Sequence, residues 1–322
     1  MKLIALFLCT LSLACSGAET AGSTRVAKWK FDKAAAFMLM FDDSMTTQVK
    51  NVVPELKGRG LIATFYVNPG GGGWKLQKDA WEKTIPEAGM EYGNHTFTHK
   101  GILDMADGTE EISKCNDVIN SILPGRKKPR LISFGVPGVP KEKWKITPEQ
   151  LKELLAKHNM VQRPNVSGRF AEINLKTADQ MLKIVDDAIA KGEKDLVAFH
   201  GVGGEWLACS MPTFVQFVNG VVERKEKLWI SDHISVHQYE TERSSATVEV
   251  LEAGEKKIAL KLSTKADPQF YDAALTLITQ VPAAWKKVSI SQGAQKSSAE
   301  VANGSVRYEA LPGNDVITLQ PE

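Results

Sequence analysis

The stretch Ala34-Ala35-Ala36-Phe37-Met38-Leu39-Met40-Phe41-Asp42-Asp43-Ser44 is the strongest indication of fold in this chain. From Ala34 to Phe41 every residue is apolar, and charged residues stand on both sides of the run. A short apolar run of this kind is typical of a strand buried on both faces, as in a parallel sheet. The strand therefore delivers Asp42 and Asp43 to its carboxyl end, where α/β enzymes keep their reactive side chains.

A second group of polar side chains follows in the run Gly93-Asn94-His95-Thr96-Phe97-Thr98-His99. Successive side chains of an extended segment point to opposite sides, so one of the paired aspartates can bind a metal while the other stays free as a base. Two histidines four positions apart can complete a facial set of ligands. The sequence therefore predicts a metal site that combines carboxylate and imidazole ligands.

Strand and helix patterns alternate through the first two thirds of the chain. The runs Ile62–Val67 and Leu196–Phe199 are predicted strands, and the second ends at His200. Helix starts are predicted at two capping boxes, Thr147-Pro148-Glu149-Gln150 and Thr177-Ala178-Asp179-Gln180. Alternating strands and helices imply an α/β fold with a parallel sheet, closed or open.

The texture of the sequence changes near Ser244, where helical patterns give way to short alternating runs. Turn residues separate these runs at Gly254, Asn303-Gly304 and Gly313-Asn314. Such spacing is typical of a small all-β sandwich. We therefore predict a signal peptide over residues 1–18, an α/β domain with the candidate site over 25–243 and a β-sandwich accessory domain over 245–322.

The N-terminus has the pattern of a secretory signal. One positive charge precedes the apolar stretch Leu3–Ala14, which is too short to span a bilayer, and the small residues Ser16-Gly17-Ala18 follow. Cleavage after Ala18 predicts a secreted or periplasmic protein. The alternative is a membrane-anchored lipoprotein acylated at Cys15, although Ser12 stands where such sites usually carry an aliphatic residue.

Composition argues against two further features. The formal net charge is +2, with acids and bases interspersed, so we do not expect nucleic acid as a partner. Cys115 and Cys209 are the only cysteines certain to remain after signal removal, too few for a disulfide framework. Because Cys115 shares an apolar helical stripe with Ile112 and Ile119, a small buried side chain is expected there rather than a bond to Cys209.

The order of these motifs resembles the polysaccharide deacetylases, the carbohydrate esterase family 4 with its NodB-homology domain. The resemblance rests on Phe41-Asp42-Asp43, on Asn94–His99 and on Phe199-His200, and it extends over roughly residues 34 to 240. It implies a distorted (β/α) barrel and a metal-dependent hydrolase that removes acetyl groups from a polysaccharide or oligosaccharide. Chitin-like, peptidoglycan, xylan and exopolysaccharide substrates remain open, as do N- and O-acetyl groups.

The resemblance also implies a role for each matching residue. Asp42 would be the catalytic base, Asp43, His95 and His99 the metal ligands, and His200 the general acid. A metal with open positions can polarise both water and a substrate carbonyl. Mixed oxygen and nitrogen ligands suit Zn²⁺, with Co²⁺ or Mn²⁺ as alternatives.

The chain departs from the family pattern in its third motif. The matching stretch Phe134-Gly135-Val136-Pro137-Gly138 has glycine where the family has an arginine that braces the base. Gly138 can still offer its backbone N–H to the oxyanion. Arg163 is a candidate for the missing cation; the alternative, a solvated surface arginine, is the commoner situation. Ser44 replaces a common glycine, which is tolerated if the backbone there is not left-handed.

Two glycine-rich loops are expected near the site. Trp206, in a glycine-rich loop after His200, is expected either to wall an acetyl or sugar pocket or to pack at the barrel rim. The run Gly70-Gly71-Gly72-Gly73-Trp74 lacks the Gly-Lys-Ser/Thr of a phosphate loop and is expected to be a mobile rim loop.

The rival function is a glycan-binding protein that has lost turnover. The missing motif arginine favours it, and the otherwise complete set of acids and histidines opposes it.

Overall fold

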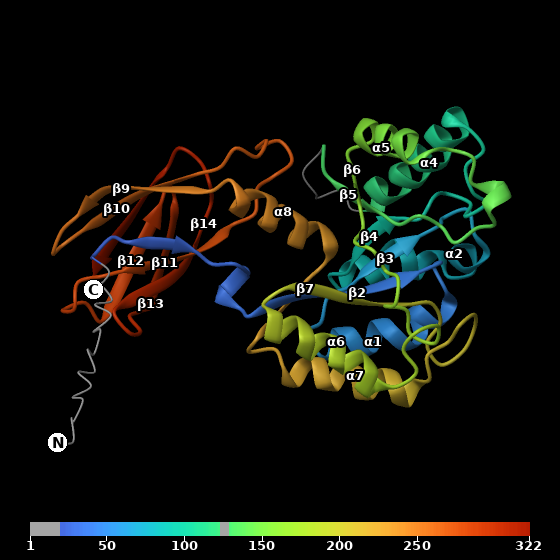
Figure 1. Ribbon diagram of the computed structural model, residues 1–322, viewed down its shortest axis with the longest axis horizontal. Helices are drawn as coiled ribbons and strands as arrows, with labels where there is room; N and C mark the ends of the chain where they lie inside the picture. The colour runs from blue at the N-terminus through green and yellow to red at the C-terminus, as the bar shows by residue number, and fades with distance from the viewer. Residues whose placement is uncertain (1–19, 123–128) are drawn as a thin grey trace, which may run out of the picture.

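The computed structural model describes residues 20–122 and 129–322. The predicted signal peptide over 1–18, with Cys15, lies outside the described residues. Figure 1 shows an α/β part on the right and an all-β part on the left, with helix α8 (His233–Ser244) between them. Within the described residues, no helix has the length and apolar character needed to cross a membrane.

A parallel sheet centred on β2 (Ala35–Asp42) forms the α/β part. Its order is β6 (Met160–Gln162), β5 (Ile132–Phe134), β4 (Glu91–Asn94), β3 (Thr64–Val67), β2 and β7 (Lys194–Phe199). A seventh strand, β8 (Leu228–Ile230), pairs with the start of β2, whereas β3 pairs with its end. All of these pairings are parallel. The predicted fold class, a distorted (β/α) barrel, is confirmed.

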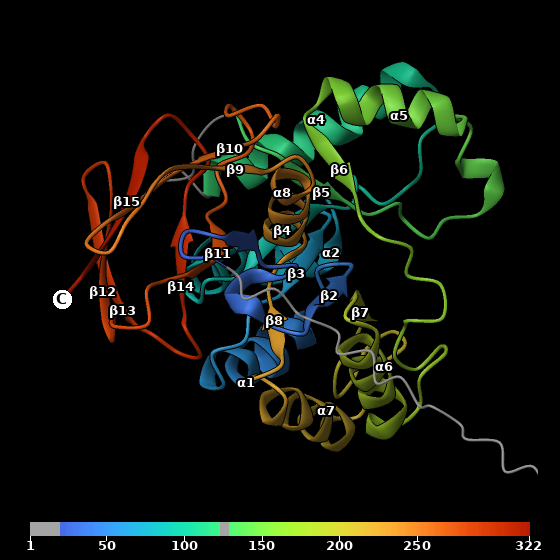
Figure 2. The same cartoon turned by 60° about the vertical axis from the view of Figure 1, so that its left-hand side comes forward.

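Helices cover this sheet in two groups. Figures 1 and 2 show α4 and α5 on one side and α1, α6 and α7 on the other. The helices are α1 (Val53–Gly58), α2 (Gly72–Leu76), α3 (Ile85–Glu87), α4 (Met105–Ile122), α5 (Pro148–Lys157), α6 (Ala178–Lys191) and α7 (Met211–Glu223). Short 3₁₀ turns span Lys30–Asp32 and Lys141–Lys143, and π-helical turns span Gln48–Val52 and Ala80–Thr84. Both predicted capping boxes are present at the starts of α5 and α6.

Side chains of β2 alternate between two buried environments. Phe41 stacks on Phe65 and Phe199 and meets Phe214 of α7 edge-on. Met38 and the other residues on the opposite face of β2 belong to a second hydrophobic cluster, which also contains residues of the all-β part. Because both faces of β2 are buried, the strand is apolar throughout, as the sequence predicted.

The all-β part consists of two antiparallel sheets. The larger has the order β13 (Gln295–Glu300), β12 (Lys287–Gln292), β15 (Val316–Pro321), β10 (Ile258–Ser263) and β9 (Thr247–Ala253). The smaller contains β1 (Thr24–Val26), β11 (Leu275–Gln280) and β14 (Ser305–Ala310). The predicted all-β region is confirmed. Strands β1 and β13 were not predicted, because β1 is only three residues long and β13 is polar and largely exposed.

The two parts share one hydrophobic cluster. This cluster contains Met38 and Met40 of β2, Tyr239 of α8, and Leu260 and Leu277 of the β sheets. Strand β1 also enters the smaller β sheet before the chain reaches the barrel. The all-β part is therefore packed against the barrel rather than tethered by a free linker.

Candidate metal and catalytic site

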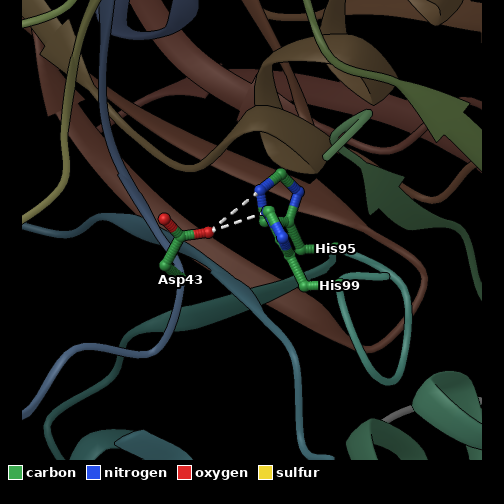
Figure 3. Close-up of side chains that lie close together, drawn as sticks. All are labelled: Asp43, His95 and His99. Carbon is green, nitrogen blue, oxygen red and sulfur yellow. Dashed lines mark ion pairs between the residues drawn. The ribbon is translucent and has the colours of Figure 1, made fainter. Parts of the chain in front are cut away.

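Three of the predicted ligands meet at the carboxyl ends of neighbouring strands. Asp43 follows β2, His95 follows β4, and His99 lies in the loop beyond it. Asp43 Oδ1 lies 3.1 Å from His99 Nε2 and 3.4 Å from His95 Nε2. Figure 3 shows the carboxylate and both rings converging. One ligand atom from each residue lies within 4.8 Å of the other two, which makes this group a possible metal site.

The surroundings of these groups fit a divalent cation. His95 Nδ1 donates to Gly135 O at 2.8 Å, which holds the ring with its Nε2 toward Asp43. Asp43 Oδ1 is buried and accepts no hydrogen bond from any described residue. Burial raises the pKa of Asp43, but the two histidine rings more than offset this and hold it below the usual range. A buried anionic oxygen beside two imidazole nitrogens suits a mononuclear metal ion.

Asp42 lies beside this group and is paired with Arg163. The guanidinium Nη1 and Nη2 donate to Asp42 Oδ1 and Oδ2 at 2.6 and 2.9 Å. The two side chains are 3% and 7% exposed, so Arg163 is not a solvated surface arginine. Burial raises the pKa of Asp42, but Arg163 and His95 outweigh it and lower the net value. Asp42 is therefore ionised at neutral pH.

Gly135 leaves the space that this arginine occupies. A Cβ at Gly135 would lie 3.0 Å from Arg163 Cζ and 2.9 Å from Tyr66 Cδ1. The guanidinium also lies over the Tyr66 ring, 4.5 Å from its centre. Arg163 follows β6, the strand next to β5, so it reaches the same place from the neighbouring strand.

His200 follows β7 and faces the metal-ligand group. Its Nε2 is 3.8 Å from Asp43 Oδ2, and its ring stacks on Phe170 with centres 4.7 Å apart. Its Nδ1 is buried and has no hydrogen-bond partner among the described residues. Burial lowers the pKa of His200, and the nearby Asp42 and Asp43 charges only partly oppose this.

Gln48 joins the two ends of the site and was not predicted. Its fully buried side-chain amide donates to Asp42 O at 2.6 Å and to His200 O at 3.0 Å. The adjoining Thr46 and Thr47 donate backbone N–H groups to the carboxylate of Glu205. Nothing in the local pattern signals this role, because the two bonded strand ends are far apart in the sequence.

The loop that carries the histidines is held by helix α4. Thr98 donates from its N–H and its hydroxyl to the two carboxylate oxygens of Glu111 at 2.8 and 2.9 Å. Asn94 accepts from Thr96 N and donates to Asn116 Oδ1, each at 2.8 Å. These contacts orient the loop between the two ligands.

The backbone at the ligands is strained. Asp43, Ser44, Thr96 and His99 have φ values of 75°, 50°, 61° and 59°, in the left-handed region that L-residues disfavour. Serine in place of the family's glycine was expected to be tolerated only if the backbone at this position is not left-handed. Because Ser44 has positive φ, serine at this position is strained. Its Oγ accepts a hydrogen bond from Asn68 N at 3.0 Å. Such strain is characteristic of functional sites.

Two predicted substrate residues lie on exposed loops. Gly138 is exposed after β5, and Trp206 is 66% exposed after β7. Among the described residues, neither forms a hydrogen bond or ring contact with Asp43, His95 or His99. Their roles therefore stay predictions.

Known proteins resemble this chain in part. A family model described as polysaccharide deacetylase matches residues 32–156. No curated protein sequence matches significantly. A family 4 carbohydrate esterase from Streptomyces lividans is 21% identical over 64% of this chain and 95% of its own, with a TM-score of 0.45. The peptidoglycan deacetylase PdaC from Bacillus subtilis is 17% identical over 63% of this chain and 90% of its own, with a TM-score of 0.42.

A CE4 family pseudoenzyme from Bacillus anthracis is also similar, at 19% identity and a TM-score of 0.42, over 60% of this chain. The match spans 63% of the pseudoenzyme's own length. The segment that matches the family model, 32–156, contains Asp42, Asp43, His95 and His99. This part of the chain is therefore similar to the polysaccharide deacetylases.

Proposed function

We propose that this protein is a metal-dependent hydrolase that removes acetyl groups from an acetylated polysaccharide or oligosaccharide. The observation that carries the proposal is the convergence of Asp43, His95 and His99 beside a second carboxylate, Asp42, that is paired with arginine. A glycan-binding protein has no use for this combination. The absence of an arginine at position 135 no longer favours the rival function, because Arg163 holds Asp42 instead.

Asp43, His95 and His99 would hold the ion, which we propose to be Zn²⁺. When bound, it would supply Lewis-acid polarisation of water and of the acetyl carbonyl. Asp42 is ionised and takes the proton that the attacking water loses. Arg163 keeps this carboxylate oriented through two parallel hydrogen bonds.

His200 is placed to give a proton to the departing amine or alcohol. It approaches the ligand group from another strand end, and its ring is held by Phe170. Gln48 keeps the backbones of Asp42 and His200 at a constant separation. We further propose that Gly138 N–H helps to bind the oxyanion and that Trp206 contacts the sugar.

Acetate release from a panel of acetylated glycans tests this function, with metal content measured on the same protein. Release that disappears with a chelator and returns with Zn²⁺ would support it. His95→Ala and His99→Ala should each lose metal stoichiometry. Glycan binding without acetate release from any member of the panel would favour the rival function.

A further inference from the structure

The glycine run after β3 does not form the free rim loop that its composition suggested. Residues 72–76 form helix α2, and Trp74 is buried against Trp81. Gly70 contacts the loop between the two histidines, Gly73 contacts the segment after Asp43, and Gly71 contacts Asn68. We propose that these three residues, the glycine wedge, set the separation of Asp43 from His95 and His99 and so tune metal affinity. This inference rests on the proposed metal site.

One side of the wedge contacts the segment after Asp43. A Cβ at Gly73 would overlap the carbonyl oxygen of Ser44, the residue that follows the ligand. Asn68 strengthens this contact by donating its N–H to Ser44 Oγ at 3.0 Å. Gly71 N in turn donates to Asn68 O at 2.7 Å. The Asp43 segment therefore rests directly on the wedge.

The other side contacts the loop between the two histidines. Gly70 N donates to Phe97 O at 2.7 Å, and Phe97 lies midway between His95 and His99. A Cβ at Gly70 would lie 2.8 Å from the same oxygen and 3.0 Å from the Phe97 ring. No side chain larger than hydrogen fits here without moving the loop.

A wedge of this kind affects the metal because both neighbouring segments are already strained. Ser44 and Thr96 have positive φ, so neither segment can absorb a displacement by a small relaxation of its backbone. A shift of Ser44 carries Asp43 with it, and a shift of Phe97 moves both histidines. Residues that orient metal ligands typically change affinity by about 10- to 100-fold when altered.

The chain supplies its own control. Gly72 stands within the same run, but a Cβ there would have no heavy atom within 4 Å, and its φ is not positive. Gly72→Ala adds the same methyl group to the same segment without touching either ligand loop. It should therefore bind metal as the wild type does.

The test is calorimetric titration of the metal-free full-length protein with Zn²⁺. Gly73→Ala and Gly70→Ala should each weaken binding by about 10- to 100-fold, whereas Gly72→Ala should not. Co²⁺ added in place of Zn²⁺ should give shifted visible absorption bands in Gly70→Ala, which reports altered ligand geometry rather than lost stability. Ser44→Gly added to Gly73→Ala should recover part of the affinity, because glycine lets that carbonyl move.

Circular dichroism of the metal-free variants shows whether each folds. If Gly73→Ala does not fold, Gly70→Ala alone tests the proposal. Wild-type Zn²⁺ affinity with unchanged Co²⁺ bands in that variant would overturn the proposed role of the glycine wedge. Equal weakening in Gly72→Ala would overturn it as well. Absence of Zn²⁺ binding by the wild type would instead overturn the proposed metal site, and the inference with it.

Discussion

The barrel and the all-β part differ in how much conformational strain they carry. Around the site, Asp43, Ser44, Thr96, His99, Glu205 and Leu207 all have positive φ without being glycine. Over residues 245–322, Asn303 alone does so, in a turn beside Gly304. The barrel also buries charges at its strand ends, whereas the all-β strands bury mainly apolar side chains. Strain and buried charge therefore concentrate where the chemistry is proposed.

This contrast predicts that substitutions in the barrel change turnover or the pH dependence of activity or stability. Substitutions in the β sheets should change stability alone.

Asp42→Asn should have the largest effect. It keeps the size of the side chain and removes the base, so turnover should fall by roughly 10² to 10⁴. Metal content should stay at the wild-type level, because Asp43 and the histidines remain. Acetate release at the wild-type rate would show that another residue is the base.

Arg163→Gln should have the second-largest effect. Breaking a buried ion pair leaves an unpaired charge and typically costs about 3–5 kcal/mol of stability. Without the arginine, burial raises the pKa of Asp42, so the carboxylate becomes protonated at a higher pH and the acid limb of kcat/KM moves upward. Arg169→Gln removes a more exposed arginine paired with Asp195 and is the control. An unmoved acid limb in Arg163→Gln would contradict the bracing role.

Leu260→Ala tests the other side of the contrast. This residue is fully buried in the shared cluster on β10, so truncation should cost about 2–5 kcal/mol in denaturant unfolding. Turnover per folded molecule should stay unchanged, since the all-β part is expected to hold no catalytic residue. A large fall in turnover at full folding would break the comparison between the two regions.

His233→Gln should produce a smaller, pH-dependent effect. Burial, with lesser contributions from His237, Lys194 and Arg163, lowers the pKa of His233 to about 3. The unfolded chain binds a proton near the ordinary value of about 6.5 and the folded chain does not. Stability that is complete above about pH 6.5 is therefore lost as pH falls toward 3, by about 2 kcal/mol between pH 7 and 5.

That loss should be absent in His233→Gln, in which an amide can keep the hydrogen bond to Ser133 Oγ. Urea unfolding at the two pH values measures it. His158→Gln, at the partly exposed end of α5, should change the pH dependence less. An equal slope in wild type and His233→Gln would show that other groups cause the acid sensitivity.

Ser44→Gly should change stability least. Glycine removes about 1–2 kcal/mol of left-handed strain. It also removes the acceptor of the Asn68 N–H, and leaving that buried donor unpaired costs about 1–3 kcal/mol. The two effects largely cancel, so the thermal midpoint should move by only a few degrees. A large gain would indicate that the hydrogen bond contributes little to stability.

Arg163 shows what the sequence left undecided. The missing motif arginine at position 135 was visible, and Arg163 was one candidate to replace it. Its distance from Asp42 depends on the pairing of β6 with β5, which no local pattern specifies. The same holds for Gln48, whose two acceptors lie on strands far apart in the sequence.

The glycine run shows where a local interpretation was wrong. Four successive glycines favour a mobile loop in isolation. In the folded chain, two ligand segments pass so close that only hydrogen fits at Gly70 and Gly73. Tertiary packing therefore gives the same residues a structural role that composition does not show.

Features that depend on near neighbours were readable from the amino acids alone. Strand β2, both capping boxes, the change to an all-β region and the spacing of His95 and His99 follow from periodicity, hydrogen bonding within a few residues and strand direction. The left-handed backbone at Ser44, the Asp42–Arg163 pair, the entry of β1 into the β sheet and the core shared by the two parts needed the folded molecule. The reason is physical: these features arise from contacts between segments distant in the chain, and packing outweighs local preference there.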